Sequence, residues 1–239
     1  MDTCTKNVSR DVKTPRDVKT RALVLKRTNY GEADRIVNLI TPEGKVSVMA
    51  KGVRKPRSKL AGGVEMFTLS EVNLHFGKGD LAVLTGAKMV RFYGEIMKDL
   101  SMMEMASGFL KEINRASEMV DSAEFFEILD KCLIALNQRF NMKVVEAWFM
   151  LNLARAMGEQ INLYTDVSGE KLRTDLKYRW DDLEMGLCAC NDGPIDVDAI
   201  KLMRLMWTMD LAVVCRVKNA DKYMPEILKI AYAVKKVVK

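Results

Sequence analysis

The chain has 239 residues, of which 49% are hydrophobic and 29% charged, and its net charge is +6. This balance excludes an intrinsically disordered chain, a collagen and a small disulfide-stapled domain. No apolar run approaches the roughly 18 residues that a membrane span needs, so we expect no membrane partner. The first twenty residues are polar and the five cysteines are mostly isolated, which favours a cytoplasmic protein without a secretory signal.

The positive charge is concentrated toward the N-terminus. Residues 20–95 carry 13 Lys and Arg against 7 Asp and Glu, whereas residues 96–239 carry 20 against 22. Such asymmetry favours a polyanionic partner for the N-terminal part. A basic surface that only faces solvent would give the same counts.

The first 96 residues predict a flexible basic arm over 1–19 and a small β-domain over 20–96. Apolar runs at 22–25 and 36–40, and period-two alternation within 46–50, 72–76 and 81–91, predict five short strands. Thr41-Pro42-Glu43-Gly44 predicts a tight turn between the second and third strands. Five such strands within about 70 residues indicate a small closed or half-closed barrel.

After residue 97 the apolar period changes from two to 3.6, which predicts a helical domain over 97–239. Ser101 and Glu104 have the spacing of a capping box at the start of its first helix, and Asn141 is a suitable N-cap further on. Residues 160–194 are irregular and leave room for a short hairpin. The predicted fold class is therefore α+β, a barrel followed by helices.

The segment from Lys51 to Lys59 contains five cations in nine residues, together with a glycine and a proline that disfavour regular structure. A mobile basic loop of this kind neutralises nucleic-acid phosphates without reading sequence. Tyr30 lies in a polar stretch and is the best candidate for stacking on an unpaired base. Gly62-Gly63 is expected to be a flexible joint after the loop. The candidate DNA-binding cations are Lys51, Arg54, Lys55, Arg57 and Lys59, extended by Lys26, Arg35, Lys45, Lys78 and Arg91 if these share one face.

Signals for catalysis or a metal are weak, so we expect no enzyme, no catalytic residue and no cofactor. His75 is the only histidine, and neither a G-x-S-x-G elbow nor a phosphate-binding P-loop occurs. Cys188 and Cys190 are separated by one residue without a second pair nearby, whereas tetrahedral zinc needs four ligands. A nuclease is disfavoured because Glu32 and Asp34 are the only close acidic pair in the β-domain.

The segment Tyr30-Gly31-Glu32-Ala33-Asp34-Arg35-Ile36-Val37, the basic loop through Gly63, and Gly77-Lys78-Gly79-Asp80-Leu81 resemble, in order and spacing, the N-terminal domain of the bacterial DNA repair protein RecO family. The resemblance implies an OB-fold followed by a helical domain. It implies binding of single- and double-stranded DNA, annealing of complementary strands, partnership with RecR, and help in loading RecA. It also implies contact with the acidic C-terminal tail of single-stranded-DNA-binding protein, and hence a place at the nucleoid.

By position, the basic patch of the family maps onto the five loop cations, and Arg35 lies in a G-E-x-D-R motif. Many members carry four zinc-binding cysteines in the second domain; here only Cys188 and Cys190 fall in that region, which implies a zinc-free member. For the acidic tail we expect a groove between helices, lined by Met and Leu with Lys or Arg at its rim. Charge and predicted fold do not separate DNA binding from an RNA-binding or ribosome-associated OB-fold protein.

Overall fold

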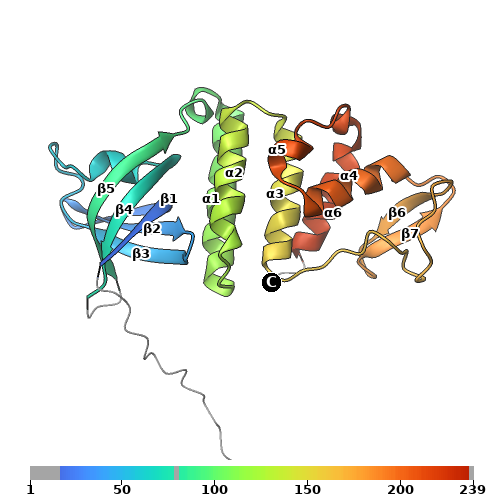
Figure 1. The fold of residues 1–239 in the computed structure, drawn as a ribbon, viewed down its shortest axis with the longest axis horizontal. Helices are drawn as coiled ribbons and strands as arrows, with labels where there is room; N and C mark the ends of the chain where they lie inside the picture. The colour runs from blue at the N-terminus through green and yellow to red at the C-terminus, as the bar shows by residue number, and fades with distance from the viewer. Residues whose placement is uncertain (1–16, 78–80, 237–239) are drawn as a thin grey trace, which may run out of the picture.

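The computed structural model describes residues 17–77 and 81–236, and its first part is a closed five-stranded barrel (Figure 1). The strands follow one another around the barrel in the order β1-β2-β3-β5-β4, and β3 and β5 pair in parallel. This closed five-stranded arrangement is that of an OB-fold, as predicted. The strands are β1 (Asp17–Tyr30), β2 (Asp34–Thr41), β3 (Gly44–Ala50), β4 (Thr68–His75) and β5 (Ala82–Phe92).

The tight turn between β2 and β3 is confirmed, because Thr41 pairs with Gly44 at the end of their antiparallel ladder. Gly44 has a φ of +119°, which a glycine adopts without strain. The first strand is much longer than its apolar run. It begins at Asp17, three residues before the predicted boundary, so residues 17–19 are part of the barrel rather than of an arm. Residues 1–16 lie outside the described ranges.

The apolar run in β1 has both of its faces buried. Ala22 and Val24 point into the barrel interior, whereas Leu23 and Leu25 belong to the core formed by the helices. The first half of β1 pairs with β4 and the second half with β2, so this strand crosses the whole barrel wall. The barrel and the helical region therefore share a packed interface instead of being joined by a linker alone.

The helical region consists of α1 (Leu100–Met119), α2 (Glu124–Asn137), α3 (Met142–Ala156), α4 (Val197–Thr208), α5 (Leu211–Val214) and α6 (Met224–Lys236). Asn141 caps α3, as predicted, by accepting hydrogen bonds from the Lys143 and Val144 amides. The predicted capping box of α1 is wrong. The cap is Asp99, whose extended backbone lets its carboxylate accept from the Met102 amide, while Ser101 already lies inside the helix.

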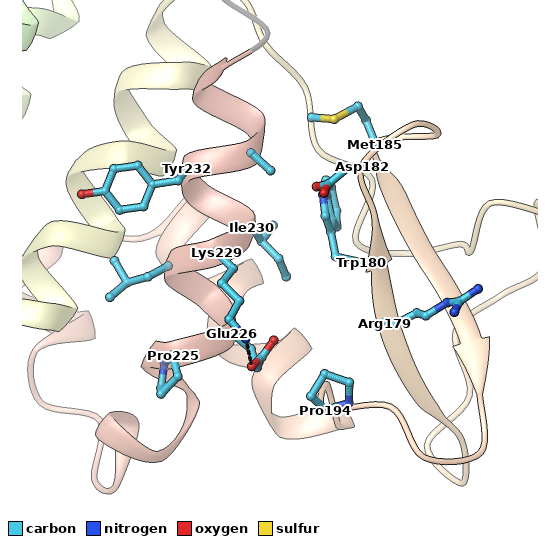
Figure 2. A pocket seen from close by; sticks show the side chains of 12 residues that line it. Arg179, Trp180, Asp182, Met185, Pro194, Pro225, Glu226, Lys229, Ile230 and Tyr232 are labelled. Carbon is cyan, nitrogen blue, oxygen red and sulfur yellow. Dashed lines mark hydrogen bonds and ion pairs between the residues drawn. The ribbon is translucent and has the colours of Figure 1, made fainter.

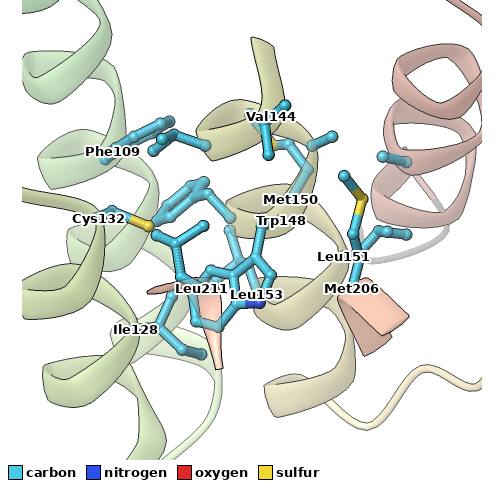
Figure 3. Close-up of a cluster of buried hydrophobic side chains, with 14 of the residues drawn as sticks. Phe109, Ile128, Cys132, Val144, Trp148, Met150, Leu151, Leu153, Met206 and Leu211 are labelled. Carbon is cyan, nitrogen blue, oxygen red and sulfur yellow. The ribbon is translucent and has the colours of Figure 1, made fainter. Parts of the chain in front are cut away.

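The core of the helical region is formed by buried residues from all six helices of the described chain, α1 to α6, and Figure 3 shows part of it. Phe109 and Phe149 stack with 4.0 Å between ring centroids. Trp148 is buried and donates its indole N–H to the Met209 carbonyl at 3.0 Å. Within the described ranges, each helix is too short or too polar to traverse a lipid bilayer.

The irregular insert contains the short hairpin for which the sequence leaves room. It pairs β6 (Lys177–Asp181) with β7 (Gly186–Cys190), and Tyr178 also exchanges backbone hydrogen bonds with Ile195. The buried Tyr178 side chain fixes the hairpin to the helical core. Figure 1 shows this hairpin at the end of the molecule opposite the barrel, with the helices between them.

Candidate nucleic-acid interface

The basic loop follows β3 directly and projects from one end of the barrel. The side chains of its five cations, Lys51, Arg54, Lys55, Arg57 and Lys59, are all exposed. Within the part of the chain that the structure describes, none of the five forms an ion pair with a carboxylate. Their charge is thus available to an external anion.

The loop is irregular, as predicted, but it is not a free tether. Lys55 N–H donates to the Gly52 carbonyl at 3.1 Å, and Ser58 N–H donates to the Lys55 carbonyl at 3.0 Å, which folds the segment into successive turns. The buried Val53 and Val64 anchor both sides of the loop in the barrel core. These anchors reduce the conformational entropy that the loop loses when it binds a polyanion.

The turn between β1 and β2 holds the basic loop in place. Arg54 donates from Nη1 to the Gly31 carbonyl at 3.2 Å and from its backbone N–H to the Ala33 carbonyl at 2.9 Å. The Asp34 carboxylate accepts the Gly52 N–H at 2.6 Å. Gly31 itself has a φ of +56°, which suits a glycine at this turn. Gly31 and Asp34 of the G-E-x-D-R motif are therefore positioning residues for the loop, a role that the sequence alone did not reveal.

Tyr30 is brought next to the basic loop by this turn. It is the last residue of β1 and is 55% exposed, so its ring is open to stacking. Other aromatic side chains of the barrel region are less accessible: Phe67 and Tyr93 are buried, and Phe76 is partly buried against the barrel core. Phe92 is exposed at the end of β5, next to Tyr93 and the helices. Tyr30 thus remains the aromatic side chain that best fits a base-stacking role at the loop end.

Two further cations lie on the strands that lead to this end. Arg35 is the second residue of β2 and donates from Nε to Asn29 Oδ1 at 3.1 Å, which leaves its terminal guanidinium nitrogens without a partner among the described side chains. Lys26 is exposed on the outer face of β1, four residues before Tyr30. Both are compatible with an extension of the loop patch along the outside of the barrel.

Lys45 and Arg91 do not join the patch, although the sequence predicts it. Lys45 lies at the opposite end of the barrel, where its Nζ contacts Glu118 Oε1 at 2.8 Å and the Asn114 carbonyl at 3.1 Å on α1. Only 13% of its side chain is exposed. The hydrogen bond from Lys45 holds the pKa of Glu118 below its ordinary value. Lys45 therefore links the barrel to α1.

Arg91 is also directed to the helices, with 4.0 Å between its Nη1 and Asp130 Oδ1 on α2. The same carboxylate accepts a short hydrogen bond from the Tyr93 hydroxyl. Burial, together with this bond, raises the pKa of Tyr93 above its ordinary value. Arg91 stands beside this pair and is only partly free for an external anion.

The glycine pair after the loop is not a flexible joint, contrary to prediction. Gly63 is buried in a short 3-10 helix (Ala61–Val64), and a Cβ placed on it would lie 2.5 Å from the Ala87 Cβ of β5. The glycine thus permits close packing of this turn against the barrel wall. Lys78, the remaining predicted cation, lies outside the described residues.

Two hollows on the helical region bear on the predicted groove for an acidic tail. One, of 840 Å³, lies between the β6–β7 hairpin and α6 (Figure 2). Trp180 and Met185 line its apolar side, but Arg179 points away from α6 and Lys229 is paired with Glu226 at 2.6 Å. The other, between α1, α3 and α6, contains several methionines but also three glutamates. Arg179 and Lys229 line the first hollow and Lys235 lines the second, but Lys229 pairs with Glu226 and Lys235 with Glu112, so the groove for an acidic tail stays a prediction.

The residues considered for catalysis or zinc lie apart from this interface. The His75 Nδ1 is 2.9 Å from Asp17 Oδ1, and the two residues face each other at the ends of β4 and β1. Cys188 and Cys190 lie on β7, where two thiols supply half of a tetrahedral zinc set. Among residues 17–77 and 81–236, no three His, Cys, Asp or Glu side chains converge on a metal position. These residues do not fit a zinc centre.

Comparisons with known proteins connect this geometry to one family. The sequence profile described as "Recombination protein O N terminal" matches residues 16–93, which include the whole barrel. A DNA repair protein RecO from Dehalococcoides mccartyi is 30% identical over 224 residues, covering 89% of this chain and 87% of its own. RecO from a Roseiflexus species is 29% identical over 224 residues, covering 90% of this chain and 79% of its own. Because the similarity extends through barrel and helices alike, the chain belongs to the DNA repair protein RecO family.

Proposed function

We propose that this protein is a DNA repair and recombination mediator that binds single- and double-stranded DNA at the loop end of its barrel and anneals complementary strands. The observation that supports this most strongly is the set of five exposed loop cations without carboxylate partners among the described residues, held beside an exposed tyrosine. Phosphate contacts of this kind carry no sequence information, so one surface serves both single strands and duplexes.

Annealing needs no chemical step. Two complementary strands repel each other, and a cationic surface lowers that repulsion while it raises their local concentration. Anchoring of the loop by Arg54, Asp34 and Val53 keeps the cations together before DNA arrives. The protein therefore acts without catalytic residues, and incubation of labelled DNA with added magnesium should produce no cleavage.

The family supports three further parts of the proposal. The protein works with RecR, contacts the acidic C-terminal tail of single-stranded-DNA-binding protein, and in this way helps to load RecA at gaps near the nucleoid in the cytoplasm. A pull-down from cell extract, repeated after nuclease treatment, tests these contacts. Partners that are retained without DNA support direct protein contact, whereas loss of all of them after nuclease contradicts it.

The direct test of the DNA-binding role compares two charge-matched variants in a strand-annealing assay. The loop variant carries Lys51→Ala, Lys55→Ala, Arg57→Ala and Lys59→Ala, and spares Arg54 because its side chain anchors the loop. The control variant replaces four exposed cations of the helical region and its hairpin insert, none of which pairs with a carboxylate among the described residues, with Ala: Lys171, Lys177, Arg216 and Lys218.

We expect annealing to fall strongly in the loop variant and to stay near the original rate in the control variant. Equal rates for the loop variant and the original protein would contradict the proposal. Single-stranded DNA and RNA offer the same phosphates and base faces, so charge and fold do not distinguish between them. A competition assay with matched DNA and RNA oligonucleotides separates DNA binding from RNA binding. Preference for RNA would favour the ribosome-associated alternative.

A further inference from the structure

A groove of 640 Å³ separates the outer side of β1 from α1, where the barrel meets the helical region. Lys26 lies on its strand side, and Lys111 and Asn114 lie on its helix side. Lys26 and Lys111 are exposed, and neither forms an ion pair within the described part of the chain. The groove therefore has two exposed cations on facing walls, and the charge of Lys26, after the hydrogen bond from Lys45, also helps to lower the pKa of Glu118.

The acidic residues around the groove already have partners. Arg27, at the edge, contacts Glu65 at 2.6 Å, and Glu118 accepts from Lys45 at 2.8 Å. None of the described residues that line the groove is acidic. The two lysines thus create a local positive potential, which favours a ligand with closely spaced negative charges.

The floor of the groove is apolar. Leu25, Met66 and Leu110 line it, and Leu25 and Leu110 are buried. An unpaired nucleotide has the matching character, since its base and sugar present apolar faces while its phosphates are anionic. A duplex keeps its bases stacked inside and cannot place them against such a floor, so the groove fits a single strand.

The outer face of β1 connects the groove to the loop end. Lys26 pairs with Asn38, Thr28 with Ile36, and Tyr30 with Asp34, so residues 26, 28 and 30 share one face of the strand. All three are exposed. Four residues of strand span about 13 Å. A single DNA strand with a base stacked on Tyr30 therefore reaches the groove by following the outer face of β1.

We propose that a single DNA strand bound at the basic loop continues along the outer face of β1 into this groove, so that Lys111 of α1 contributes to strand binding. This inference rests on the proposed function and adds that the helical region is part of the DNA site. The occupant is a single-stranded polynucleotide because the outer face of β1 connects the groove to the loop end, and because the groove has exposed lysines on both walls and an apolar lining.

The first test measures binding of labelled oligothymidylates by fluorescence anisotropy, using the variant Lys26→Ala with Lys111→Ala. Its control is Lys171→Ala with Lys218→Ala, which removes the same charge at the other end. The oligonucleotides have about 4 and about 16 nucleotides, the limits of an OB-fold site. For the longer one we expect the slope of log affinity against log salt to decrease in magnitude by about 1.4. For the shorter one we expect no change.

An unchanged slope for both oligonucleotides would overturn the inference. If the loop variant still loses DNA affinity in that case, the proposed function stands and only the extension into the groove fails. If the loop variant also binds normally, the proposed function fails as well. The two results are therefore distinguishable in one experiment.

The second test does not depend on variants. The full chain is treated with an amine-acetylating reagent with and without each oligonucleotide, and modification of Lys111 is measured by mass spectrometry. Protection by the longer strand alone supports the inference. Absence of protection contradicts it, as does equal protection by the shorter strand, which would make the groove the primary site. Protection by an aspartate-rich peptide but not by DNA would assign the groove to a protein partner instead.

Discussion

The salt dependence of DNA binding is the most informative property to measure, because its slope is proportional to the number of phosphate contacts that the loop makes. The loop variant removes Lys51, Lys55, Arg57 and Lys59, whose side chains are exposed and free of carboxylates among the described residues. On a single strand, each phosphate contact contributes about 0.7 to the slope of log affinity against log salt concentration. Removal of all four should decrease the magnitude of that slope by about 2.8.

The same arithmetic gives a fold-change. Between about 50 and 200 mM salt the concentration rises fourfold, so four contacts account for an affinity loss of about 50-fold over that range. The ratio of the original protein's DNA affinity to that of the loop variant should therefore decrease by about that factor between the two salt concentrations. Fluorescence anisotropy with an oligothymidylate across a salt series measures both slopes, and circular dichroism checks that each variant is folded.

The control variant, with Lys171, Lys177, Arg216 and Lys218 replaced, should retain the original slope. If the loop variant keeps the full slope, the loop cations do not contact phosphates. If both variants lose equal slope, the effect is one of general charge and the binding surface is not localised at the loop.

Three further variants test individual assignments. Lys45→Met should leave DNA affinity unchanged but lower the melting temperature by about 2 °C. Because the folded-state pKa of Glu118 is depressed, this difference in stability should be complete above about pH 5 and should disappear as the pH falls through that depressed pKa. A loss of DNA affinity would instead show that Lys45 belongs to the DNA interface. Gly63→Ala should destabilise by about 1–3 kcal/mol in urea unfolding, because the added methyl group meets Ala87; unchanged stability would indicate a mobile joint. Tyr30→Ala should weaken single-strand binding by about 1–3 kcal/mol while Tyr30→Phe should not, and equal effects of both changes would exclude stacking.

Local patterns in the sequence predicted most of the fold. The proline and glycine of the β2–β3 turn, the period-two strands and the cap at Asn141 each depend on neighbouring residues, and all were confirmed. The cap of α1 was not predicted, because Ser101 and Asp99 both have suitable side chains. Only the extended backbone at Asp99, set by how the barrel joins the helix, decides between them.

The candidate site was predictable in its centre but not at its edges. The dense cluster of cations from Lys51 to Lys59, with its glycine and proline, predicted a loop, and all five cations of this loop are exposed. Lys45 and Arg91 look identical to these cations in a charge count, but their partners Glu118 and Asp130 lie far along the chain on docked helices. The positioning roles of Gly31 and Asp34 likewise depend on backbone contacts between two loops.

The most direct measurement of where DNA binds is photo-crosslinking of the full chain to a single strand that contains halogenated pyrimidines, with the linked peptides identified by mass spectrometry. We predict crosslinks at Tyr30 and within residues 51–60, the exposed end of the barrel. Crosslinks confined to residues 124–236, with the loop peptides unmodified, would contradict binding by the barrel and place the strand on the helices.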